Sequence, residues 1–154
     1  MKVIPARLED IPRLCELLDT LFSQEAEFSP NRENQVRGLR LIMADPAIGT
    51  ILVLKDGEGI VGMVNLLYTV STFLGAKVAM VEDVIIAPSH RKQGAGTVLL
   101  QGAVDHALRQ GCQRLTVLTD RANAPAHALY RKLGFAPSEM IPFRRLLSDE
   151  SKKV

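Results

Sequence analysis

Two glycines and two basic side chains within six residues form the first group that could do chemistry. Arg91, Lys92, Gly94 and Gly96 follow a nearly all-apolar run of strand length, and a helical pattern begins at the glycines. A helix N-terminus leaves backbone N–H groups without partners and carries partial positive charge, which favours an anion. The glycines let a ligand approach the main chain, and the basic residues add full charges. This order of elements predicts a site for a phosphate or pyrophosphate group.

Two familiar phosphate loops do not fit this stretch. A Walker loop requires GxxxxGK followed by Ser or Thr, and the sequence contains no such string. A dinucleotide-binding fingerprint requires GxGxxG, but Leu99 occupies the position of its third glycine. The predicted phosphate site therefore belongs to another class of loop.

A pair of adjacent acids, Glu82 and Asp83, interrupts the apolar run that leads into the loop. A carboxylate beside a ligand site could act as a general base. Because side chains alternate along a strand, we expect the two acids to point to opposite faces, so that only one faces a reacting group.

A second group lies downstream, between Asn123 and Phe135. Asn123 can cap a helix, Pro125 suits its first turn, and Gly134 suits its end. Tyr130 lies seven residues after Asn123 and therefore shares its helix face. The pattern predicts a short helix that presents an amide and a phenol on one side.

Hydrophobic periodicity and turn signals predict the elements that must position these groups. We expect helices over residues 10–23, 31–44, 94–109 and 123–133, the first with Asp10 as its N-cap, and strands over residues 1–7, 50–54, 60–70, 77–86, 114–119 and 140–147. The crossover through a helix makes the strand at 114–119 parallel to its predecessor. We expect one domain over residues 1–147, followed by a polar tail, residues 148–154.

Composition argues against several classes of function. A chain of 154 residues with a net charge of +2 suits one globular domain and does not favour nucleic acid as a partner. There is no apolar run of about 18 residues, so no membrane partner is expected. The first ten residues carry charges instead of a signal-peptide core, which predicts a cytoplasmic protein with reduced Cys15 and Cys112. The three histidines are scattered, and no metal site is expected.

The two motifs together resemble those of the GNAT family of N-acetyltransferases. The string RxxGxG from Arg91 is similar to the family's acetyl-CoA signature, and the helix from Asn123 to Tyr130, followed by Leu-Gly-Phe, is similar to a second family pattern. The resemblance implies an α/β (α+β) domain with a mixed, mostly antiparallel central sheet of six to seven strands and about four flanking helices. It also implies a splay between the strands at 77–86 and 114–119.

The resemblance further implies where acetyl-CoA, the cosubstrate, would bind. Its pyrophosphate would accept hydrogen bonds from backbone N–H groups of residues 93–97, and its pantetheine arm would pair with the main chain of residues 84–86. The residues implied in cofactor binding are Val84, Ile85, Ile86, Arg91, Lys92, Gln93, Gly94, Ala95, Gly96, Thr97, Asn123 and Tyr130.

In similar enzymes the acceptor amine attacks the thioester directly, and a tyrosine protonates the departing thiolate. Tyr130 takes that place here, and the proton transfer is uphill by only about 2 kcal/mol for an ordinary phenol and thiol. An amine near neutral pH must first lose a proton. The Glu-Asp pair is similar to that of polyamine and related small-amine acetyltransferases, which implies Glu82 as the base and leaves Asp83 or water as alternatives.

The acceptor side of such enzymes is formed by the loop between the first two helices and by the last strands. The residues this implicates are Phe22, Glu25, Glu27, Phe28 and Phe143, and Asp83 of the central strand is a further candidate for binding the substrate. Acids and aromatic rings suit a cation, so we expect acetyl transfer to a primary amine of a small molecule. The alternatives are a peptide or protein N-terminal acetyltransferase and a non-catalytic acyl-CoA-binding or sensing domain. The resemblance also raises the expectation of a homodimer.

Overall fold

The computed structural model describes residues 1–24 and 29–147, which contain four α-helices, five strands and two short 3₁₀ helices. The α-helices are α1 (Ile11–Phe22), α2 (Arg32–Ala44), α3 (Ala95–Arg109) and α4 (Ala124–Lys132). The strands are β1 (Lys2–Pro5), β2 (Gly49–Asp56), β3 (Gly59–Ser71), β4 (Ala76–Ile86) and β5 (Leu115–Val117), and the 3₁₀ helices are η1 (Leu8–Asp10) and η2 (Pro88–His90).

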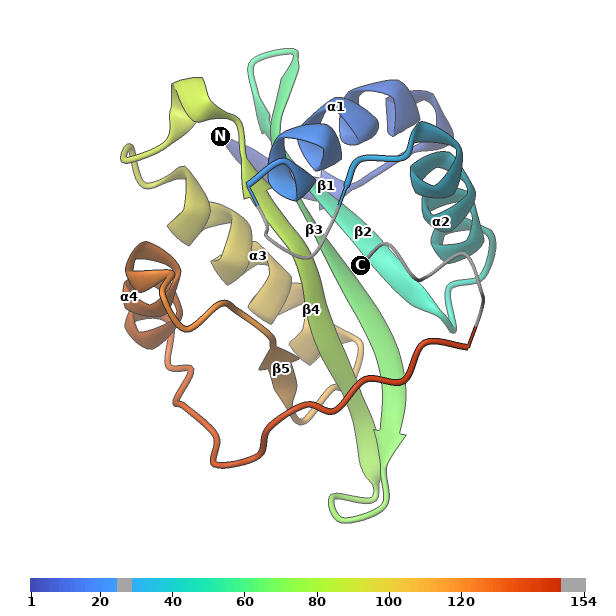
Figure 1. Cartoon of the computed structure of the whole chain (residues 1–154), viewed down its shortest axis with the longest axis vertical. Helices are drawn as coiled ribbons and strands as arrows, with labels where there is room; N and C mark the ends of the chain where they lie inside the picture. Colours follow the sequence, from blue (N-terminus) through green and yellow to red (C-terminus); the bar gives the residue numbers. More distant parts are fainter. Residues whose placement is uncertain (25–28, 148–154) are drawn as a thin grey trace.

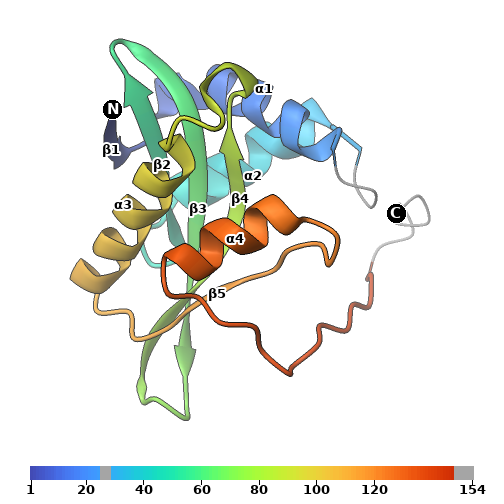
Figure 2. The same cartoon turned by 90° about the vertical axis from the view of Figure 1, so that its left-hand side faces the viewer.

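The strands form one sheet whose order follows the chain, from β1 to β5. Neighbours are antiparallel except for β4 and β5, which are parallel because α3 connects them as a crossover. Helices α1 and α2 cover one face of the sheet, and α3 and α4 lie on the other (Figures 1 and 2). The expected α/β (α+β) class and the mostly antiparallel sheet are confirmed.

Burial on both faces explains the continuous apolar runs of the central strands. In β2, Leu52 and Leu54 belong to the core beneath α3, whereas Ile51 and Val53 belong to the core beneath α1 and α2. A strand covered on both sides requires apolar residues at every position instead of alternation. The buried residues of β3 and β4 likewise divide between these two cores, according to the face of the sheet on which each side chain lies.

The helix starts use different caps. Asn31 caps α2, and its side-chain oxygen accepts a hydrogen bond from the N–H of Asn34 at 3.0 Å. Asp10 stands at the N-cap of α1, but its side chain does not cap that helix and instead accepts from the N–H of Arg7 at 2.8 Å. Asp10 is therefore at the predicted N-cap position, but its carboxylate is hydrogen-bonded within the turn that precedes α1.

The β4–β5 ladder is short. Ala79, Met80 and Val81 pair with Leu115, Thr116 and Val117, and β4 then continues to Ile86 without a β5 partner. The two strands part where the sequence motifs lie, as the expected splay requires.

The prediction of a final strand over residues 140–147 is wrong, and within the described residues the sheet has five strands instead of six to seven. Pro142 cannot donate to a ladder, and a proline inside a strand is tolerated only at an edge or bulge. The apolar side chains of Met140, Phe143 and Leu147 are exposed instead of facing a core. Apolar composition alone therefore gave the wrong prediction for this segment.

Within the described residues, every helix is too short or too polar to cross a lipid bilayer.

Candidate active site

The loop between β4 and α3 is held in shape by its own side chains. Arg91 Nε donates to the carbonyl oxygen of Ile86 at 2.9 Å, and Gln93 Nε2 donates to that of Ser89 at 3.0 Å. Lys92 adopts a left-handed backbone conformation with φ of 60°. The loop is thus shaped by its own side chains, and Arg91 uses one of its five N–H donors to hold it, while the others have no partner within residues 1–24 and 29–147.

The two glycines of this loop serve different purposes. Gly94 has φ of 82° at the N-cap of α3, and a Cβ atom placed there would meet nothing within 4 Å, so the backbone conformation is what requires glycine. A Cβ at Gly96 would lie 3.1 Å from Cδ2 of Leu129, so Gly96 lets α4 pack closely. Among the residues that the structure describes, no side chain caps α3. Its first N–H groups are therefore oriented for an anion.

The close packing of Gly96 against Leu129 brings the two sequence motifs together. Leu129 precedes Tyr130 on α4, and Leu129 and Tyr130 both pack against the core beneath α3 and α4. The Tyr130 ring lies 5.8 Å from the Phe135 ring, centroid to centroid. Helix α4, which carries Tyr130, consequently packs near the first turn of α3, and Figure 2 shows the two helices on the same side of the sheet.

Asn123 caps α4, as its sequence position predicts. Its side-chain oxygen accepts from the N–H of Ala126 at 3.2 Å. The helix ends with Gly134 at φ of 84°, and the N–H of Phe135 returns to the carbonyl of Tyr130 at 3.0 Å. The cap uses the oxygen of Asn123 and leaves its amide N–H₂ group for other contacts.

The end of β4 combines a buried side and an open edge. Ile85 is buried in the core beneath α1 and α2, whereas Val84 and Ile86 pack toward α3 and α4. On the β3 side, Ile85 and Ile86 are in register with Met63 and Gly62. On the other side the β5 ladder has already ended, so the backbone of this segment presents an edge to which an extended ligand could bind.

The two adjacent acids of β4 share one face of the sheet, and the expectation that they point to opposite faces is wrong. A bulge interrupts the β3–β4 register, and Asp83 within it has φ of 53°. Glu82 stands directly opposite Asn65, and residues opposite each other share a face. The Asp83 carboxylate accepts a hydrogen bond from Nδ2 of the same Asn65 at 2.5 Å. The left-handed residue breaks the alternation on which the prediction depended.

This shared face is the one covered by α1 and α2, since Asn65 lies two residues from Met63 of that core. Glu82 is exposed and Asp83 is half-buried. Asn65, at 2% exposure, was not among the sequence candidates. Its signal was a lone amide in the apolar run of residues 60–70.

The acceptor side is described in part. Phe22 is the last residue of α1 and packs against the core beneath α1 and α2, while Phe143 is exposed. Glu25, Glu27 and Phe28 lie outside the described residues.

A polar cluster, in which only Gln35 is buried, crosses from α1 to α2. Gln35 Nε2 donates to Asp19 Oδ1 at 2.8 Å, and Arg32 lies 3.4 Å from the other oxygen of that carboxylate. Burial raises the pKa of the nearby Cys15 thiol, an effect that Arg32 opposes. This cluster ties the two helices together at the base of the loop between them.

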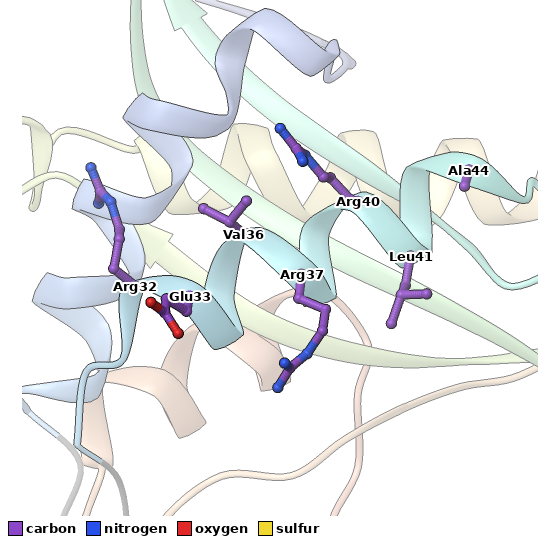
Figure 3. A pocket seen from close by; sticks show the side chains of 7 residues that line it. All are labelled: Arg32, Glu33, Val36, Arg37, Arg40, Leu41 and Ala44. Atoms are coloured by element: carbon purple, nitrogen blue, oxygen red, sulfur yellow. The ribbon is translucent and has the colours of Figure 1, made fainter.

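A surface hollow of about 600 Å³ lies elsewhere, along one face of α2 (Figure 3). The described residues that line it are Arg32, Glu33, Val36, Arg37, Arg40, Leu41 and Ala44. None of them belongs to either sequence motif. Among the described residues, no group of three or more metal-ligating side chains gathers at any point.

The sequence profile of the acetyltransferase (GNAT) family matches residues 11–135. This range begins at α1 and includes both the β4–α3 loop and α4. The chain belongs to the GNAT family. Among GNAT structures and sequences, it is 43% identical over 56 residues to streptothricin acetyltransferase of Streptomyces lavendulae, which covers 36% of this chain and 30% of that protein. It is 25% identical over 133 residues to aminoalkylphosphonate N-acetyltransferase of Salmonella typhimurium, and this match covers 86% of this chain and 83% of that protein.

A solved structure supports the fold of this GNAT chain over nearly its full length. An integron cassette protein from the mobile metagenome of Cole Harbour Salt Marsh aligns with a TM-score of 0.83 at 25% identity, over 95% of this chain and 90% of that one. The match to the streptothricin relative spans less than a third of that protein, and a match to an uncharacterised Bacillus subtilis N-acetyltransferase spans 57% of it.

Proposed function

We propose that this chain is an N-acetyltransferase that moves an acetyl group from acetyl-CoA to a primary amine of a small molecule. The observation that carries the proposal is the contact of Gly96 with Leu129, because it sets the helix of Tyr130 beside the uncapped start of α3. In this proposal the start of α3 binds the phosphate groups and Tyr130 donates the proton, on either side of the edge of β4 that β5 leaves open. Family membership supports the same activity.

The described residues fit acetyl-CoA as cosubstrate. Uncapped N–H groups at the start of α3, with Arg91 and Lys92 beside them, suit the pyrophosphate. The unpaired edge at residues 84–86 suits the amide-bearing pantetheine arm, although Arg91 already occupies one lone pair of the Ile86 carbonyl. The free N–H₂ group of Asn123 supplies a donor on α4.

We assign the reacting groups the roles that the resemblance to the family implies. The amine nitrogen forms a bond to the acetyl carbonyl carbon, the carbon–sulfur bond breaks, and the sulfur leaves as a thiolate. Tyr130 donates its proton to that sulfur. Glu82, exposed on the face opposite α3, accepts the proton that the ammonium loses, directly or through water.

The names of two relatives, acting on streptothricin and on aminoalkylphosphonates, support a small-molecule amine as acceptor. We extend to this chain only what they have in common, which is an amine on a small molecule. The cytoplasm, where acetyl-CoA is available, is the proposed location, and the homodimer remains a proposal.

The test is release of free thiol from acetyl-CoA across polyamines, amino acids, aminoglycosides, aminoalkylphosphonates and peptides. Tyr130→Phe should lower turnover by about 10²- to 10⁴-fold with little change in acetyl-CoA binding. Tyr68→Phe is the matched control, because it removes a hydroxyl that bonds Thr50 at 3.0 Å, away from both motifs. Equal turnover in the two variants would remove Tyr130 from the chemistry.

Glu82→Gln tests the base. The variant should lose most activity at low pH, where the acceptor is most fully protonated and depends most on a base. Glu58→Gln, in the exposed β2–β3 turn, is the control. A wild-type pH profile in Glu82→Gln would exclude that role.

A further inference from the structure

The loop between β5 and α4, residues 118–123, lies on the side of the splay that faces the free edge of β4. The ladder of β4 and β5 ends at Val81 and Val117, after which β4 continues to Ile86 and the loop leads to the start of α4 (Figure 2). Every residue of the loop is exposed. Since no hydrophobic core fixes its path, its hydrogen bonds must do so.

The backbone carbonyl of Asp120 is the point at which this loop is attached to α4. Its oxygen accepts a hydrogen bond from the N–H of Asn123 at 3.0 Å and lies 2.9 Å from Nε2 of His127. A carbonyl oxygen can only accept, so Nε2 of His127 must carry the proton of this bond. Within the part of the chain that the structure describes, this is the only side-chain hydrogen bond made to residues 118–122.

The same bonds hold Asn123 in one orientation. Its backbone N–H is bonded to Asp120, its side-chain oxygen accepts from the N–H of Ala126 at 3.2 Å, and its backbone carbonyl accepts from the N–H of His127 at 3.0 Å. His127 is therefore connected to this turn twice, through its backbone to Asn123 and through its ring to Asp120. The ring bond closes the turn against the first two turns of α4.

We propose that His127 is a positioning residue of the acetyl-CoA site, and that its Nε2–H group holds residues 120–123 in the place where the pantetheine arm can bind between them and β4. This inference rests on the proposed function. The amide groups of the arm need donors and acceptors, which the β4 edge offers on one side and the Asn123 N–H₂ group on the other. A donor on an exposed loop adds more affinity when the loop is ordered before the ligand arrives, because less conformational entropy is lost on binding.

Two substitutions of one residue separate the hydrogen bond from the bulk of the ring. His127→Phe keeps a ring and removes the N–H donor, whereas His127→Gln retains a side-chain N–H₂ group that can reach the Asp120 carbonyl. Calorimetric titration with acetyl-CoA, in the absence of amine, should show affinity weakened by about 2- to 12-fold in His127→Phe, the usual net contribution of one hydrogen bond. His127→Gln should bind acetyl-CoA within about twofold of wild type. The KM for acetyl-CoA should follow the affinity, while kcat changes less.

His106→Phe is the matched control. His106 is also a half-buried histidine on a helix, but its Nε2 atom has no hydrogen-bond partner among the described residues, and it lies in a hollow between α3 and β1. Its affinity for acetyl-CoA should equal that of wild type. Urea unfolding of all variants tests the purely structural alternative, in which His127→Phe loses stability and binds acetyl-CoA normally. That result overturns the inference, as does equal weakening in His127→Phe and His127→Gln.

Hydrogen exchange in the free protein tests the loop without any ligand. The N–H of Asn123 should exchange faster in His127→Phe than in wild type and recover in His127→Gln, because the Asp120 carbonyl that it bonds is then held again. Unchanged exchange in His127→Phe would mean that the ring does not hold the loop, and the inference would fail. A wild-type chain that binds no acetyl-CoA would instead refute the proposed function, and the exchange result would still decide whether His127 orders the loop.

Discussion

Replacing Gly94 with alanine measures how much the left-handed backbone conformation at the end of the β4–α3 loop contributes to stability and to acetyl-CoA binding. Gly94 has φ of 82° and ψ of −4°, and an added Cβ would meet no atom within 4 Å. The whole cost is therefore conformational, about 1–2 kcal/mol for a residue with a Cβ in the left-handed region. For a chain of this size we expect the melting temperature to fall by about 2–8 °C if the loop keeps its shape.

The strain at Gly94 can also appear as lost affinity. If the loop of Gly94→Ala relaxes in the free protein, acetyl-CoA must restore the left-handed turn to reach the N–H groups of α3. The same 1–2 kcal/mol then weakens binding by about 5- to 30-fold instead of lowering stability. The losses in stability and in affinity should therefore add up to the strain, whichever way it is divided.

Gly75→Ala is the matched control for this prediction. Gly75 has φ of 60° in the β3–β4 turn, and its added Cβ would also meet nothing within 4 Å. Urea unfolding measures the free energy of unfolding of both variants, and calorimetric titration with acetyl-CoA in the absence of amine measures affinity. Gly75→Ala should lose stability alone. The reasoning is refuted if Gly94→Ala changes neither quantity, or if Gly75→Ala weakens acetyl-CoA binding equally.

Two further variants and one labelling experiment probe the scaffold. Gly62→Ala should lower the unfolding free energy by more than Gly94→Ala, by about 1–3 kcal/mol from overpacking, because its Cβ would lie 2.9 Å from the Ile85 carbonyl oxygen; urea unfolding checks this. Burial lowers the pKa of His106, so the unfolded state binds more protons below about pH 6.5 and the wild type loses stability as pH falls. His106→Gln should flatten the stability profile between about pH 7 and 5, and an unchanged slope would contradict this sign. Burial raises the pKa of both cysteine thiols, so Ellman's reagent should label them slowly at pH 8 until denaturant is added, and rapid native labelling would contradict their burial.

The elements that carry the two motifs could be predicted from sequence because each depends on neighbouring residues. The helices, the β2–β4 meander and the order of strand, loop and helix rest on periodicity, caps and turn residues that act within a few positions. Asn123 is an example, since its cap on α4 is local. The purpose of Gly96 was not predictable in this way, because the residue that requires it, Leu129, is 33 positions away and contacts it only in the folded chain.

The segment over residues 140–147 shows the limit of composition. A strand forms only when a partner edge accepts it, and the identity of that edge is not encoded in the segment itself. Its apolar residues are the same whether they face a core or solvent. In the described chain they face solvent, and Pro142 removes a donor from the middle of the run.

The bulge in β4 is the feature of the site that sequence could not supply. Alternation along a strand is a sound rule only while every residue is extended, and one left-handed residue reverses it from that point onward. Asp83 takes that conformation because Asn65, on a different strand, holds its carboxylate. The two acids read from sequence as alternatives for one role, since only one was expected to face the acetyl group. On one face they differ in surroundings instead, since Asp83 is half-buried and hydrogen-bonded to Asn65, whereas Glu82 is exposed. The different surroundings of two adjacent carboxylates thus depend on an amide that lies 18 residues away in the chain.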